Sequence, residues 1–121
     1  MESILNSIKQ LLGVSEEETH FDTDIIIHIN SAFSTLNDVG VGPEKTFSIV
    51  DEKPIWDDFV EEDDYNDVKT YVYLKVKLLF DPPSSSYVID AMTRQKDEIE
   101  WRLTVRASNK AMEGNDDDDE E

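Results

Sequence analysis

The chain contains no cysteine, which excludes disulfide bonds, thiol catalysis and zinc–thiolate sites. It has two histidines, His20 and His28, and neither lies near a serine- or cysteine-based catalytic motif. Gly40 and Gly42 precede a proline rather than a lysine-bearing helix, so there is no phosphate-binding loop. No segment approaches the roughly 20 apolar residues that a membrane span needs. We therefore expect no enzyme, no cofactor and no membrane protein.

The acidic residues do not indicate a metal site. Paired acids at 57–58 and 61–64 lack the alternating ligands and the turn glycine of an EF-hand loop, so a solvated run of charge explains them better. His28 falls beside apolar positions of a predicted helix, where a core or boundary histidine is far more common than a catalytic base.

Negative charge dominates the chain, and its distribution is uneven. The net charge is -18 over 121 residues. Residues 1–65 hold 16 acids and 3 bases, residues 66–112 hold 6 acids and 8 bases, and residues 113–121 add seven acids. Such acidity argues against wrapping nucleic acid through phosphate contacts. It suits a surface that lies near DNA without gripping it, or one that meets a basic partner.

Apolar spacing with glycine and proline stops predicts four helices, near residues 3–12, 23–39, 66–80 and 86–106. The third of these also alternates like a strand, but its length favours a helix. The fold class is therefore mainly α: a small four-helix domain over residues 1–108. Residues 109–121 are low in complexity and acidic, and we expect them to form a disordered tail.

Several residues are placed to begin or end these helices. Ser3 is a plausible cap of the first helix and Gly13 ends it, while Thr23 or Asp22 is expected to cap the second. Gly40 suits a left-handed C-terminal cap. A rigid corner between the last two helices is predicted at Asp81-Pro82-Pro83, and the serines that follow can cap the last helix.

The connection from about Gly40 to Asp64 is long for a compact domain and is partly structured. Residues 46–49 alternate like a short strand, and residues 54–59 resemble one helical turn. Aromatic and aliphatic side chains recur in it: Phe47, Ile49, Ile55, Trp56 and Phe59. Either they plug the open side of the helical bundle, or some of them, Trp56 and Phe59 above all, pack on another subunit.

The last predicted helix offers a second candidate interface. Trp101 lies two residues beyond the core position Ile99, about 200° round the helix, and so points partly away from the core. An exposed tryptophan beside an arginine is typical of interface anchors. Packing of Trp101 on the long connection is the alternative. The candidate residues here are Trp101, Arg102, Val105, Arg106 and Met112.

The proline corner belongs to the segment Lys77-Leu78-Leu79-Phe80-Asp81-Pro82-Pro83, which is followed by Ala91-Met92 and by Glu100-Trp101-Arg102-Leu103. With these residues the chain resembles the head–tail connector (adaptor) proteins of tailed bacteriophages that infect Gram-positive bacteria. The resemblance spans roughly residues 4–106. It implies a ring of copies seated on the portal protein, at one vertex of the DNA-filled head. It also implies that residues 101–112 lie near the portal.

Two functional interpretations follow. The favoured one is a virion structural protein that extends the portal channel, supports head completion and tail attachment, and binds a downstream head-closure or tail protein. Double-stranded DNA would pass through the ring without sequence-specific binding, and assembly would take place in the host cytoplasm. The alternative is an acidic DNA mimic that inhibits a basic host protein, which leaves the proline corner and the apolar connection unexplained.

Overall fold

The computed structural model describes the backbone of residues 2–119 and the side chains of residues 2–113. Within that range the chain forms four α-helices: α1 (Ile4–Leu12), α2 (Asp22–Asp38), α3 (Tyr65–Phe80) and α4 (Ser86–Asp119). Two 3-10 turns, η1 (Trp56–Asp58) and η2 (Glu62–Asp64), interrupt the connection between α2 and α3. The described residues form no β-strand, only an isolated bridge between Ser3 and Ile55. The predicted mainly helical fold is confirmed.

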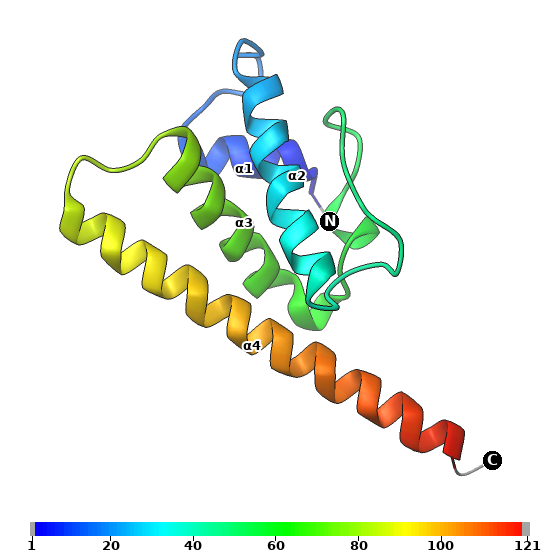
Figure 1. Cartoon of the computed structure of the whole chain (residues 1–121). Coiled ribbons are helices and arrows are strands. Elements are labelled where there is room, and N and C mark those ends of the chain that lie inside the picture. The colour runs from blue at the N-terminus through cyan, green and yellow to red at the C-terminus, as the bar shows by residue number, and fades with distance from the viewer. Residues whose placement is uncertain (1, 120–121) are drawn as a thin grey trace.

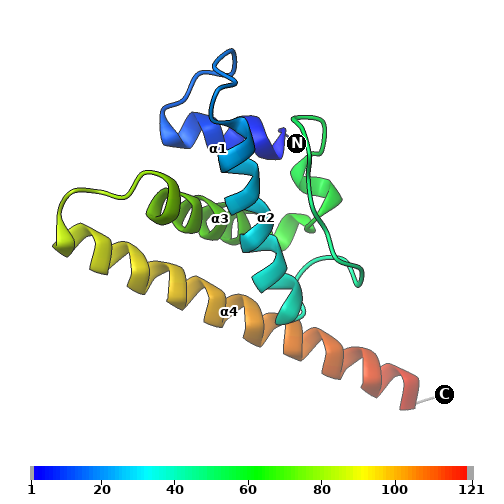
Figure 2. The same cartoon turned by 45° about the horizontal axis from the view of Figure 1, so that its top comes forward.

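The central helix of the fold is α3 (Figure 1). It packs against α2 on one side and α4 on the other, and α1 contacts both α2 and α3. After the proline corner, α4 turns back along α3. Its C-terminal part extends beyond the other helices, as two views of the molecule agree (Figures 1 and 2). The end of α4 is therefore available to partners.

The helix ends follow the predicted signals at most positions. The Ser3 hydroxyl accepts a hydrogen bond from the Asn6 N–H at 3.2 Å, and Gly13 ends α1 at a φ of 81°. Gly40 has a φ of 91°, a left-handed conformation that glycine adopts without strain. At the start of α4, the Ser85 hydroxyl accepts from the Val88 N–H at 3.5 Å.

The predicted cap of α2 is wrong. The helix begins at Asp22 after Phe21, and no side chain caps it. The Asp22 carboxylate instead pairs with the Lys9 ammonium at 2.8 Å. Lys9 is 1 % exposed and also donates to backbone carbonyls of the 13–21 connection, those of Glu16 and Glu18, at 3.1 and 2.7 Å. Because a buried ammonium is costly without partners, this cluster holds the connection over α1.

Residues 65–80 are helical, so the alternating strand pattern is not realised there. Val68, Tyr71, Val72 and Val76 are fully buried at helical spacing. The Tyr71 hydroxyl donates to the Glu100 carboxylate on α4 at 2.7 Å. Burial, followed by this contact with the carboxylate, raises the pKa of Tyr71 far above its ordinary value. Apolar packing and this hydrogen bond thus help to join α3 to α4.

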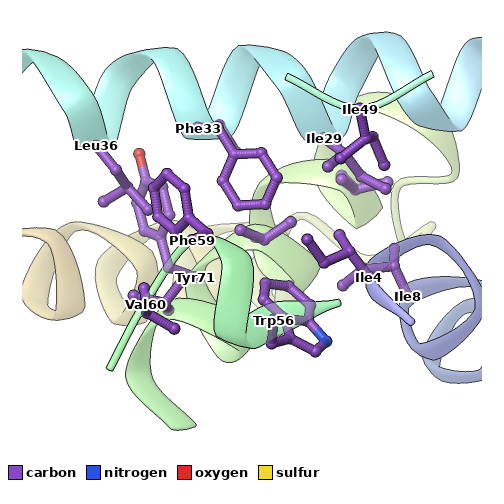
Figure 3. Close-up of a cluster of buried hydrophobic side chains, with 14 of the residues drawn as sticks. Ile4, Ile8, Ile29, Phe33, Leu36, Ile49, Trp56, Phe59, Val60 and Tyr71 are labelled. Carbon is purple, nitrogen blue, oxygen red and sulfur yellow. The ribbon is translucent and has the colours of Figure 1, made fainter. Parts of the chain in front are cut away.

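Aromatic side chains from the long connection complete the core (Figure 3). Trp56 is fully buried, and its indole N–H donates to the Ser7 hydroxyl at 2.8 Å. The Phe59 ring lies 4.3 Å from the Phe33 ring, measured between centroids. A Cβ added at Gly42 would meet the Phe59 ring at 2.6 Å, so only glycine fits there without movement. The connection is therefore a plug for the bundle.

Two asparagines on α2 hold the extended part of this connection. The Asn30 amide accepts from the Ile49 N–H at 2.8 Å and donates to the Ile49 carbonyl at 3.0 Å. Asn37 donates to the Val41 carbonyl at 2.9 Å and accepts from the Phe47 N–H at 3.2 Å. These side chains serve the backbone groups that a partner strand would serve. The predicted strand at 46–49 therefore does not form, whereas the predicted turn at 54–59 appears as η1.

The last helix is longer than predicted, because its backbone stays helical to Asp119 rather than ending near Arg106. Residues 107–112 contain no proline or glycine that would stop it. The side chains at 109–113 are exposed. Most of the predicted tail falls outside the residues whose side chains are described, and residues 120–121 lie outside the description altogether.

Candidate functional site

An exposed apolar stripe runs along the outer face of α4. Trp101 is 67 % exposed, Val105 37 % and Met112 61 %. At 100° per residue these three positions fall within about 40° of one another. Leu103, about 200° away from Trp101, is buried against the rest of the fold, as is Ile99. The expectation that apolar surface remains exposed at this end of the chain is confirmed, and Trp101 does not pack on the long connection.

The two candidate arginines lie on the flank between the stripe and α3. Arg102 pairs with Asp67 at 3.2 Å and with Glu98 at 3.0 Å. Arg106 pairs with Asp67 as well, and its Nε lies 3.4 Å from the Asp64 carboxylate. Both arginine side chains are about four-tenths exposed. They therefore act first within the subunit, and they still present part of their guanidinium groups to solvent.

Lys110 extends the same row of cations. Its Nζ lies 3.6 Å from the Glu61 carboxylate and 3.8 Å from that of Asp64. The cations are spaced four residues apart on α4. The acids are spaced three residues apart: Glu61 lies just before η2, Asp64 ends η2 and Asp67 lies in α3. We call these six residues the charge ladder: Arg102, Arg106, Lys110, Glu61, Asp64 and Asp67.

Asp67 joins two cations of the charge ladder, Arg102 and Arg106. Burial acts to raise its pKa, but hydrogen bonds from Arg106 and Arg102 outweigh that and hold the pKa of Asp67 below its ordinary value. The carboxylate is thus kept charged where two guanidinium groups meet it. Beyond Leu103, the last fully buried residue of α4, the helix is held by the partly buried Ala107 and by the ladder.

Sequence reasoning missed the acidic half of this ladder. It treated Glu61 to Asp64 as a solvated run of charge and did not single out Asp67. The sequence did contain a signal for the ladder: acids spaced three residues apart, and cations spaced four residues apart in the helix that folds back along α3. The antiparallel pairing that joins them depends on the tertiary structure, which composition does not give.

Trp56 and Phe59 are removed from the candidate interface. Trp56 is fully buried and Phe59 almost so, which leaves no side-chain surface for another subunit. Both belong to the plug, the other interpretation of the long connection. Their aromatic character alone did not distinguish a core position from an interface.

At the helix corner, α3 ends at Phe80 and the Asp81 N–H donates to the Lys77 carbonyl at 3.0 Å. The Lys77 ammonium pairs with the Asp81 carboxylate at 2.9 Å. Pro82 and Pro83 follow, and neither can donate a backbone N–H to continue the helix. The first turn of α4 is open to solvent: Val88 is exposed, and the helix begins to pack on the core further on, at Met92.

These features define a small helical protein with an exposed apolar stripe beside a row of ion pairs. Among the side chains described, no group of three or more acids or histidines is arranged to hold a metal ion. None of the helices in the described part of the chain is both long and apolar enough to cross a membrane.

The sequence model of the phage connector protein family matches residues 4–110. The chain therefore belongs to the phage connector protein family, and its role is that of a structural connector of a phage particle. No curated protein and no solved structure matches the chain. The matched range covers all of α1, α2 and α3 and the part of α4 that carries the charge ladder.

Proposed function

We propose that the chain is a head–tail connector that binds the portal protein as a ring of identical copies. The ring extends the DNA channel, supports head completion and receives a downstream head-closure or tail protein. Its site of action is the virion of a tailed phage, one that infects a Gram-positive host, and it assembles in the host cytoplasm. The role is structural, and it requires no catalysis and no cofactor.

The single observation that carries this proposal is the stripe formed by Trp101, Val105 and Met112. Large apolar side chains left exposed together on one helix face mark protein interaction sites. Arginine beside tryptophan is the composition of binding hot spots. The stripe lies on the outer face of α4, where the charge ladder pairs this part of the helix with α3 and the 61–64 segment. We propose that it is an assembly surface of the connector.

The charge of the chain supports the channel role. A surface with a net charge of -18 repels DNA phosphates, so a duplex slides past it without binding. Membership of the connector family favours this role over that of an acidic DNA mimic. In a DNA mimic the acidic surface is itself the binding site, and truncation of an apolar stripe has little effect.

Co-sedimentation with the portal protein of the same phage tests the proposal. Trp101→Ala is expected to weaken association, since truncating a hot-spot residue often costs about 2 kcal/mol or more. Tyr87→Ala is the matched control, because Tyr87 is an exposed aromatic residue on the same helix but far from the stripe. Deleting residues 113–121 is expected to matter much less. Equal sedimentation of Trp101→Ala and the native chain, or no sedimentation of either, contradicts the proposal.

A further inference from the structure

A second apolar surface lies at the opposite end of the molecule from the stripe. It is a groove of about 550 Å³ between the start of α2 and the end of α3. We call it the corner groove; its lining residues are Val14, Phe21, Asp24, His28, Leu79, Phe80 and Asp81. The sequence did not indicate this groove, because Phe21 lies just before α2 and Leu79 lies near the end of α3, two segments far apart in the chain.

The walls of the corner groove are apolar and open to solvent. Leu79 is 53 % exposed, and the Phe21 ring packs edge-on against the Phe80 ring with 5.6 Å between centroids. The rim carries two exposed carboxylates, those of Asp24 and Asp81, the second of which is paired with Lys77. A segment that fits here therefore carries apolar side chains and has no acids of its own.

Residues 101–112 of α4 have that chemistry. They include three cations and no acidic residue, in a chain that is strongly acidic overall. The stripe supplies the apolar side chains, and Arg102 and Arg106 flank it with partly exposed guanidinium groups. The pairing of an acidic, apolar groove with a basic, apolar helix face is complementary in both charge and hydrophobicity.

The stripe cannot fill the groove of its own chain. The groove lies at the corner where α4 begins, whereas Trp101 and Met112 lie about 22 and 39 Å along the helix from Ser86, at 1.5 Å per residue. Figures 1 and 2 show the two ends of α4 on opposite sides of the molecule. A contact between different surfaces on opposite ends is heterologous, and repeating it closes a ring when the rotation allows.

We infer that the corner groove of one copy receives the Trp101–Met112 stripe of the next copy, head to tail. The inference rests on the proposed function, since it identifies the contact that joins copies within the connector ring. It also assigns the chemical basis of that contact: apolar burial inside the groove, with acids on its rim facing cations on α4.

The lack of native cysteine makes disulfide trapping a clean test. The variant carries Leu79→Cys in the groove and Val105→Cys in the stripe, both at exposed positions where substitution leaves the core intact. It is oxidised while bound to the portal and, separately, as concentrated free protein. A heterologous contact is expected to give a series of covalent oligomers: dimers, trimers and larger species. Each single-cysteine variant can give dimers at most.

Leu79→Cys combined with Val50→Cys is the matched control, because Val50 is highly exposed on the long connection but belongs to neither surface. This control is expected to give no series of covalent oligomers. If the groove–stripe variant gives no more than this control in either sample, the inference is overturned. If no covalent oligomers form but the chain still co-sediments with the portal, only the inference is overturned. If covalent oligomers form without portal binding, the contact is supported and the proposed function is overturned.

Discussion

Replacing Asp67 with asparagine removes the negative charge that Arg102 and Arg106 share and leaves the shape of the side chain. Asp67 pairs with both Arg102 and Arg106. The arginine side chains are more than a third exposed, so solvent screening keeps each pair near the low end of the usual range. At about 0.2–1 kcal/mol a pair, Asp67→Asn is expected to lower the free energy of unfolding by about 0.5–2 kcal/mol.

The direction of the pKa shift of Asp67 determines how this loss of stability depends on pH. The pKa of Asp67 is lowered in the folded chain, from an ordinary value of 3.8. Its stabilising contribution is therefore fully present above the unfolded pKa and is lost as pH falls through the lowered folded pKa. The difference between native chain and variant should be constant from pH 5 to 7 and should shrink below about pH 4.

Urea unfolding at pH 7 and at pH 3 measures both the loss of stability and its pH dependence. Asp90→Asn is the control, since Asp90 is exposed and has no ion-pair partner among the described residues. An unchanged midpoint for Asp67→Asn at pH 7 refutes the role of the ladder. A difference that persists undiminished after the carboxyl group is protonated refutes its electrostatic origin.

Three further variants or conditions test other parts of the structure. Replacing Pro82 and Pro83 with alanine is expected to lower stability by about 0.5–2 kcal/mol, chiefly by enlarging the unfolded ensemble, as measured by unfolding midpoints. Trp56→Ala leaves a cavity and removes the hydrogen bond from the indole to the Ser7 hydroxyl, and thermal unfolding should report a loss of about 3–5 kcal/mol. Occupancy of the portal by the connector should fall as salt is raised, because exposed pairs are screened over about 10 Å at 0.1 M; a flat titration would leave apolar packing alone.

Most of the helical fold could be predicted from local signals. Gly13, Gly40 and the proline corner mark real helix ends because backbone conformation at those positions depends mainly on the residue itself. Helix α3 was ambiguous by pattern and was decided by length. The end of α4 was predicted too early, since no proline or glycine lies between Arg106 and residue 114 to stop the helix.

The candidate site could be predicted only in part. Exposure of Trp101 follows from its angle to the buried Leu103, which is a property of one helix. Burial of Trp56 depends on Phe33 and Ser7, which come from two other helices, so local pattern left it undecided. The corner groove forms where the start of α2 lies beside the end of α3, and no spacing within either helix indicates it.

Electron microscopy of the portal protein mixed with the chain tests the connector role most directly. The expected image is a portal with an added ring of density on one end, in register with the DNA channel. Trp101→Ala should reduce the share of portals that carry the ring, and Tyr87→Ala should leave it unchanged. Portals that stay bare at every concentration of the native chain would contradict the assignment of this protein as a portal-bound connector.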